Sequence, residues 1–245
     1  VLVPMAGDDT TPEGEQVNIY GNHVGSWNFA ATAYLNQWKV KIYYEHYFDD
    51  HSQMFFQYGR WKDGHIGLEI TFPKNRFIDT FVYEGLGTKD QTGPMLYDSF
   101  WGEFEEQISA KDNYYNHYLY QGWQHWGMGI GNPLLPGPIY NKNGQITFIS
   151  NRVLAHHIGF CGSPCQSLSY RMLLSYSRHW GTYDNPLNEI KKQFNSLFEV
   201  TYAPQQLKGW SFTVSGAMDR GSMLGNNYGG MLVIRKQGII KSGNK

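Results

Sequence analysis

The sequence has no apolar run of about 18 residues, the shortest stretch that indicates a transmembrane helix, so it predicts no membrane-spanning helix. Its charge is nearly balanced, with 20 Lys and Arg against 21 Asp and Glu, and it contains no basic run. Nucleic acid is therefore not expected as a partner, because phosphates attract clustered basic residues. A mean hydropathy of −0.50 still allows a membrane β-barrel, since only every second strand residue faces lipid.

Cysteine is also scarce. The chain has only Cys161 and Cys165, which flank the turn-forming residues Gly162, Ser163 and Pro164. In an exported protein the two cysteines could form a disulfide across the end of a hairpin, and two unpaired thiols beside a turn would have the same spacing. No second Cys/His pair has the spacing of zinc ligands, so we expect neither a metal ion nor another cofactor.

The N-terminus shows no signal peptide. Residues 1–16 lack both the basic start and the apolar core of such a leader. If the protein is exported, we expect the sequence to begin after its leader or within a longer protein.

Aromatic residues and glycine are abundant. The chain contains 18 Tyr, 14 Phe and 8 Trp, which together make up 16% of its residues, and 28 Gly. A protein with many strands, aromatic girdles and open loops has this composition. A soluble carbohydrate-binding sandwich has it too.

Apolar and polar side chains alternate along much of the sequence, which predicts half-buried strands and an all-β protein. The alternation is clearest in residues 38–45, 168–177, 194–202 and 210–215. In a membrane barrel the apolar set faces lipid. The residues that we expect there are Trp38, Val40, Ile42, Trp210, Phe212 and Val214.

The expected connections differ in length. Short turns are predicted at residues 36–37, 62–64, 161–166 and 203–206, and the other connections at 49–53, 74–76, 181–192 and 219–227. Through the final strands, short and long connections alternate, as in outer-membrane barrels, where tight periplasmic turns lie opposite extended outer loops. Greek-key sandwiches follow no such rule. The pattern predicts an antiparallel transmembrane β-barrel with about ten strands, at roughly 22–25 residues for each strand and its connection.

We predict one barrel domain over residues 17–240. An extension, or the continuation of an upstream part, precedes it at residues 1–16, and a tail follows it at residues 241–245. The tail lacks the terminal aromatic residue that is usual in outer-membrane barrels.

Three ordered segments carry a family resemblance: residues 127–141 (GMGIGNPLLPGPIYN), 151–159 (NRVLAHHIG) and 170–183 (YRMLLSYSRHWGTY). Their succession resembles the capsule assembly protein Wzi family of outer-membrane β-barrels. The match is best from about residue 118 to residue 183 and extends to about residue 240. Family members are longer, so the resemblance implies that this chain is a portion of a larger barrel, its C-terminal half or slightly more.

The resemblance implies a non-enzymatic protein of the bacterial outer membrane that binds and anchors capsular or surface polysaccharide. Its partners would be that polysaccharide and outer-membrane lipid. Two other functions remain open on the sequence: a secreted or surface β-sandwich enzyme that acts on glycosides, and a passive porin-like channel.

Candidate polysaccharide-binding residues are aromatic side chains, which stack on sugar rings, and amide or guanidinium groups, which meet hydroxyls or acidic groups. They are Tyr118, Tyr120, Trp123, Trp126, Asn132, Arg152 and Arg171. The aromatic residues could instead form an interfacial girdle or a packed loop, and the arginines could pair with carboxylates inside the barrel. Pro133, Pro136 and Pro138 predict a rigid loop that folds into or over the lumen.

Two further groups could suggest chemistry. Glu103, Glu105 and Glu106 are carboxylates, but positions along one strand do not predict the facing pair that a glycosidase needs. His156 and His157 are adjacent, so on a strand they point to opposite faces and do not share a metal ion. We expect the inward-facing histidine to be hydrogen-bonded in a polar interior.

Overall fold

A computed structural model describes residues 24–49, 63–75, 77–94, 96–97, 109–110, 112–117 and 122–238. Within these ranges no helix is long and apolar enough to cross a membrane. Several sequence predictions fall outside the described residues: the extension at 1–16, the tail at 241–245, Tyr118, Tyr120, Glu103, Glu105 and Glu106.

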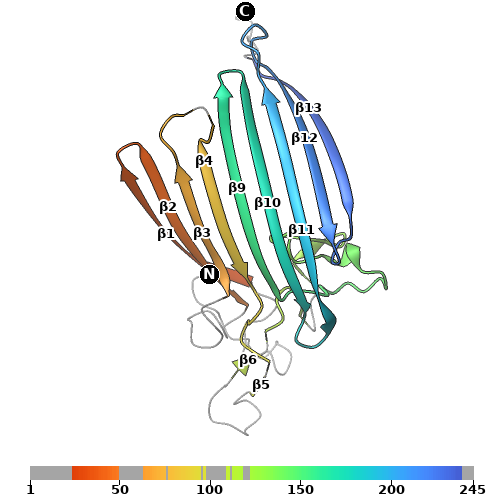
Figure 1. The fold of residues 1–245 in the computed structure, drawn as a ribbon. Helices are drawn as coiled ribbons and strands as arrows, with labels where there is room; N and C mark the ends of the chain where they lie inside the picture. Colours follow the sequence, from red (N-terminus) through yellow and green to blue (C-terminus); the bar gives the residue numbers. More distant parts are fainter. Residues whose placement is uncertain are drawn as a thin grey trace, which may run out of the picture.

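Nine strands form one antiparallel sheet in the order β1-β2-β3-β4-β9-β10-β11-β12-β13 (Figure 1). Their bounds are Val24–Leu35, Trp38–Asp49, Gly64–Thr71, Thr80–Gly87, Val153–Cys165, Leu168–Gly181, Pro186–Tyr202, Trp210–Gly221 and Asn227–Lys236. The smaller elements are β5 (Leu96–Tyr97), β6 (Ser109–Ala110), β7 (Gln124–His125), β8 (Met128–Gly129) and the short 3₁₀ helix η2 (Pro138–Tyr140). The prediction of an all-β antiparallel protein is confirmed.

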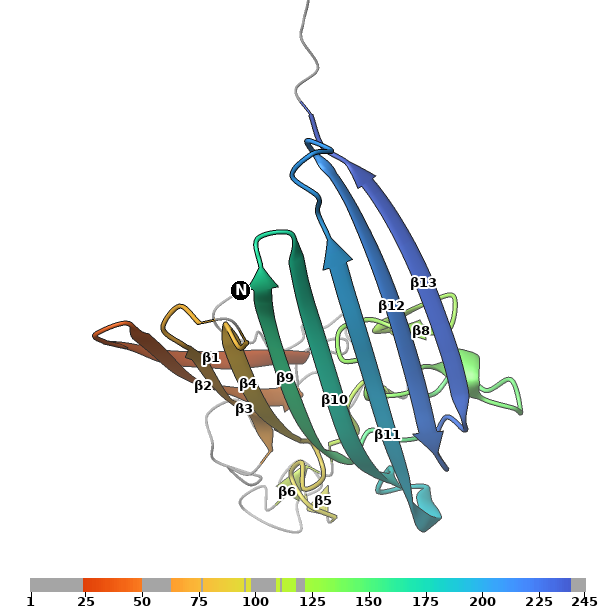
Figure 2. The same ribbon diagram turned by 45° about the horizontal axis from the view of Figure 1, so that its top comes forward.

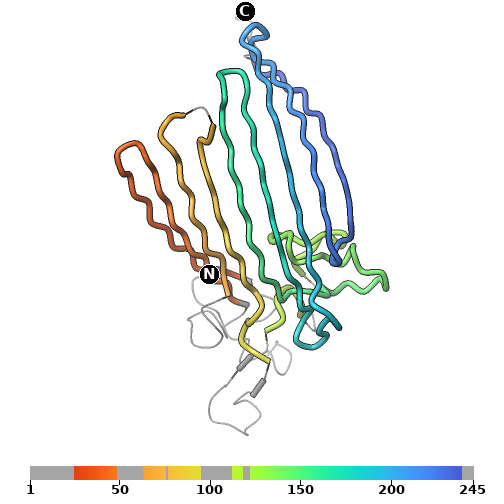
Figure 3. The backbone as a smooth tube through the Cα atoms, viewed as in Figure 1, coloured from red at the N-terminus to blue at the C-terminus, as the bar shows by residue number. Residues whose placement is uncertain are grey.

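The sheet is bent into a trough (Figure 2). Its edges are β1 and β13, which pair on one side only within the described residues. Because nine antiparallel strands alternate in direction, the two edge strands run the same way, as the trace shows (Figure 3). One end of the trough, the turn end, carries connections 36–37, 72–79, 166–167 and 203–209. The other, the insert end, carries connections 182–185 and 222–226 and the insert, which comprises the described residues between 88 and 152.

The period-two pattern separates the two faces of the trough. Glu45, His157 and Ser175 line a cavity on the concave face, so their strand neighbours point outward. The predicted outward set therefore shares the convex face. Val214 is 61% exposed there, whereas the next residue, Ser215, is buried and donates a hydrogen bond to Glu199.

Three of the predicted connections are wrong. The long loop at residues 181–192 is mostly strand β11, and only residues 182–185 connect it to β10. Thr182 closes this turn by accepting the N–H of Asn185 at 2.9 Å. Pro186 is then the first residue of β11, where a missing N–H is tolerated. The loop at residues 219–227 likewise shortens to 222–226 because β12 and β13 pair up to Asp219 and Asn227.

The third correction concerns residues 161–166. Strand β9 continues through Cys165, and only residues 166–167 form the turn. The register with β10 shifts between Leu168 and Tyr170, which marks a bulge around Pro164. A bulge is one of the few places where a sheet accepts proline. The alternation of short and long connections is consequently lost in the final strands.

The insert packs against the strand ends through a small hydrophobic core. Tyr115, Leu135 and Phe148 of the insert meet three strand residues, Leu86, Val153 and Ala155. The glycine-proline segment predicted to be a rigid loop belongs to this unit.

Gly137 is required by the close approach of two backbone segments in the insert. A Cβ atom at this position would lie 2.5 Å from the nitrogen of Gly129 and 2.6 Å from the oxygen of Gly127. Backbone atoms cannot move aside as a flexible side chain can, so only glycine allows this packing.

Candidate binding site

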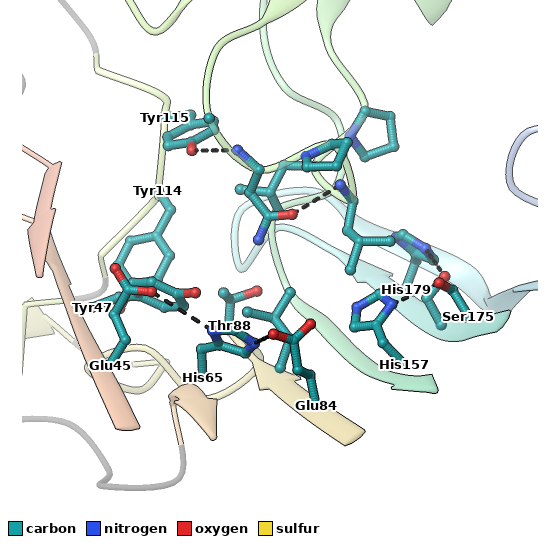
Figure 4. A pocket seen from close by; sticks show the side chains of 18 of the residues that line it. Glu45, Tyr47, His65, Glu84, Thr88, Tyr114, Tyr115, His157, Ser175 and His179 are labelled. Carbon is teal, nitrogen blue, oxygen red and sulfur yellow. Dashed lines mark hydrogen bonds and ion pairs between the residues drawn. The ribbon is translucent and has the colours of Figure 1, made fainter. Parts of the chain in front are cut away.

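A cavity of about 840 Å³ lies between the concave face and the insert (Figure 4). One wall consists of residues from β1, β2, β3, β4, β9, β10 and β11 together with Leu224, and the other of the insert. None of the described residues that line it is Lys or Arg. Glu45 and Glu84 do line it, and two carboxylates suit a neutral or cationic ligand.

The strand wall holds two carboxylates with a histidine between them. Antiparallel register places Glu45 opposite His65. The ring of His65 lies 3.8 Å from a Glu45 oxygen through Nδ1 and 3.5 Å from a Glu84 oxygen through Nε2. Ser26 donates a hydrogen bond to Glu45 at 2.6 Å, and Tyr43 donates one to Glu84. These contacts hold the carboxylates in place on the cavity wall.

The adjacent histidines on β9 point to opposite faces, as predicted. His157 lines the cavity, and its Nδ1 lies 2.7 Å from the hydroxyl of Ser175. His156 is on the convex face, with its Nδ1 2.9 Å from the hydroxyl of Tyr83. The expectation of a hydrogen-bonded inward histidine is confirmed.

The insert wall is aromatic and aliphatic. Tyr115 lies edge-on to Phe148, with ring centroids 5.1 Å apart, and its hydroxyl accepts the N–H of Asn132 at 3.2 Å. Asn132 also accepts the N–H of Leu134 at 2.9 Å, which fixes the start of the proline-rich segment. Apolar faces opposite polar acceptors suit a sugar ring, which has both apolar faces and hydroxyl donors.

A buried polar network ties the insert to the strand ends. Asp63, just before β3, accepts the backbone N–H of Asp90 at 3.1 Å and that of Gln91. The Gln91 amide donates to Asn151 at 3.2 Å, and Thr88 donates to the Asn151 carbonyl at 2.6 Å. Burial raises the pKa of Asp63 to about 6, against the opposing effect of the two N–H donors.

The two candidate tryptophans have different environments. Trp123 is half-buried and stacks on Tyr115, with centroids 6.1 Å apart. Trp126 is 83% exposed. Both have positive φ angles, near 55°, which are uncommon for tryptophan and reflect the tight path of the insert. Asn132 lines the cavity.

Neither of the two candidate arginines is among the residues that line the cavity. Arg152 stacks on Tyr183, 3.8 Å from the ring centroid, and its Nε donates to the Lys89 carbonyl at 2.9 Å. Arg171 pairs with Glu199 at 3.4 Å and lines a smaller cavity of about 260 Å³. Arg171 therefore pairs with a carboxylate on the concave face, which was the alternative to a role in polysaccharide binding.

Cys161 and Cys165 are free thiols. They lie on one strand, and a strand rises about 3.3 Å per residue, so their separation far exceeds the reach of a disulfide. Their spacing allowed either a disulfide or two unpaired thiols, and the structure has two unpaired thiols.

The sequence did not single out Glu45, His65 or Glu84. Alternation over residues 38–45 places Glu45 on the polar side of its strand, but it does not say which polar residues of different strands meet. Strand register decides this. A scan against family models and a search of curated proteins find no match to this chain.

Proposed function

We propose that this chain forms part of a bacterial outer-membrane β-barrel that binds and anchors capsular or surface polysaccharide without cleaving it. The main support is the opposite character of the two faces of the trough. The convex face exposes many large apolar side chains to an extent that a water-facing surface rarely shows. Ten such side chains on this face have exposed fractions between 42% and 79%: Phe29, Leu35, Trp38, Ile42, Ile66, Phe198, Val214, Tyr228, Leu232 and Ile234.

Aromatic side chains collect near both ends of this convex face, which further supports membrane insertion. Trp38 and Trp210 begin strands at the turn end, and Tyr202 ends a strand there. Towards the insert end lie Tyr228, the second residue of β13, and Tyr176, the ninth of the fourteen residues of β10. Aromatic girdles at these two levels mark the two interfaces of a barrel with water.

The cavity supports the polysaccharide as ligand. Glu45 and Glu84 offer acceptors for sugar hydroxyls, and the insert offers aromatic and proline surfaces. Exposed Trp126 adds a stacking surface on the same insert. The ordered resemblance to the Wzi family points to the same function.

A glycoside-active enzyme is the second candidate, because Glu45 and Glu84 are two carboxylates in one cavity. Such enzymes require a general acid and a second carboxylate on either side of the bond. Here His65 lies between the two carboxylates, which favours binding over hydrolysis. A passive channel is less well supported, since the insert packs against the concave face.

Capsule retention tests the proposal in cells of the source bacterium that lack the native gene. Trp126→Ala should release capsular polysaccharide into the medium while the protein still inserts into the outer membrane, because an exposed stacking surface is lost. Trp123→Ala should also destabilise the insert, since this side chain stacks on Tyr115. Ile146→Ala, at an exposed aliphatic position of the insert, is the control and should retain the capsule.

Normal retention by both Trp126→Ala and Glu84→Gln would contradict the proposed binding site. Purified protein should leave the polymer length unchanged. New reducing ends that appear with time, and disappear in Glu84→Gln, would instead establish the enzyme.

A further inference from the structure

Three basic side chains form a row on the convex face near the insert end. They are Arg178 on β10, Lys192 on β11 and Arg220 on β12. Their strand neighbours His179 and Gln193 line the cavity, and Asp219 accepts a hydrogen bond from Asn195 on the concave face, so alternation turns the three cations outward.

Strand register brings these cations together. Arg178 is the direct partner of Lys192. Arg220 is opposite Phe194, two positions along β11 from Lys192, which makes Arg220 and Lys192 diagonal neighbours. Like charges directly opposite on a sheet are unfavourable. A pair in this arrangement is stabilised when an anion lies between the two cations.

The described side chains around the row supply no such anion. The nearest outward positions are apolar or aromatic: Leu154, Tyr176, Trp180, Ile190, Phe194 and Met218. The guanidinium of Arg178 lies 5.3 Å from the ring centroid of Trp180. Lys89 lies 5.5 Å from the same ring, but its ammonium pairs with Asp90 at 3.6 Å. The three cations of the row make no ion pair with a described carboxylate.

The position of the row identifies the class of anion. The cations lie towards the insert end of the convex face, where the aromatic residues Tyr176 and Trp180 stand on either side of Arg178 along β10. At this level a membrane protein meets lipid headgroups, and long basic side chains reach phosphates there. A planar guanidinium binds a phosphate through two parallel hydrogen bonds.

We propose that Arg178, Lys192 and Arg220 form a binding site for the phosphate groups of an anionic membrane lipid. The proposal rests on the membrane insertion proposed above but not on polysaccharide binding. The site is separate from the cavity, since it occupies the other face of the sheet. It would hold the barrel at a set depth, with the insert outside the membrane.

The test is a titration of detergent-solubilised protein with bisphosphorylated lipid A and with the same lipid after removal of its phosphates. Wild-type protein should bind the phosphorylated lipid at least about tenfold more tightly, because charge-assisted contacts are lost with the phosphates. The triple variant Arg178→Gln, Lys192→Gln, Arg220→Gln should lose this preference. Lys192→Arg, which keeps the charge, should preserve it.

A matched control removes three cations from the turn end: Lys208→Gln, Arg235→Gln and Lys236→Gln. This variant should retain the phosphate preference. Flotation with vesicles measures membrane insertion separately for the wild type and each variant. Failure of the wild-type protein to float with the vesicles would refute the membrane proposal itself. Equal binding of both lipids by the wild type, or an unchanged preference in the triple variant, would overturn the lipid site.

Two competitors distinguish other sources of negative charge. Inorganic phosphate at the lipid concentration should not displace the lipid, and displacement would indicate a site for the free ion. The second competitor is polygalacturonate. If it binds through the same three residues and the protein shows no preference for the phosphorylated lipid, the row is a site for an acidic polysaccharide instead.

Discussion

Thr213 and Val214 are neighbours on β12 that face opposite sides of the sheet. Val214 is exposed on the convex face, whereas Thr213 bonds the hydroxyl of Thr201 at 2.8 Å on the concave face. Val214→Arg should lower the free energy of unfolding in lipid vesicles by about 2–4 kcal/mol, because arginine would enter the bilayer. Thr213→Arg should cost less. Urea titration measures both, and equal losses would contradict the assigned faces.

Asp63 should make stability depend on pH. Its folded-state pKa, about 6, lies above the ordinary value of 3.8, so this carboxyl stabilises the fold fully below about pH 4. That contribution is lost as the pH rises through 6, because the folded state must then hold a buried charge. The loss amounts to about 2–3 kcal/mol.

Asp63→Asn removes the ionisation but keeps only one acceptor for the two backbone N–H groups of Asp90 and Gln91. The variant should be less stable than the wild type at pH 4, and the difference should shrink towards pH 7. Urea unfolding across this range measures the difference. A constant difference would show that Asp63 does not titrate there.

At the scale of the elements, the connections predict an orientation in the membrane. Residues 182–185 and 222–226 share the insert end, and Cys165 lies at the turn end. If the turn end is periplasmic, Asn185→Cys and Asn226→Cys should react with an impermeant maleimide on intact cells. These substitutions are best made with Cys161 and Cys165 replaced by serine.

The native thiol of Cys165 provides an internal control, because it is exposed. In otherwise unchanged protein it should react only after the outer membrane is permeabilised. Labelling of Cys165 on intact cells, with protection of positions 185 and 226, would reverse the orientation.

At the scale of the whole molecule, the odd number of strands that the structure describes in the large sheet, nine, constrains closure of a barrel. The two edges, β1 and β13, run in the same direction, so closure by antiparallel pairing alone needs an odd number of additional strands. Cysteines introduced at Ala31 and Leu232, one on each edge, should therefore form no disulfide within one chain in membranes. An intramolecular bond, detected by gel mobility under oxidising conditions, would show direct closure of β1 on β13.

The sequence by itself determined the class of fold and the two faces. Period-two alternation is a local property of each strand, so it placed Trp38 and Val214 on one face and the two adjacent histidines on opposite faces. The Asn36–Gln37 turn was equally readable, because its two residues separate two alternating runs. Alternation requires no knowledge of which strands pair.

Only the tertiary structure decided where strands end and which polar residues meet. Residues 181–192 read as a loop in isolation, but pairing with β10 extends β11 through most of that segment. Glu45 and Glu84 meet in one cavity because register across β2, β3 and β4 aligns them around His65. Trp123 and Trp126 are indistinguishable in sequence, and contact with Tyr115 buries only the first. These outcomes depend on contacts between residues far apart in the chain, which local patterns do not encode.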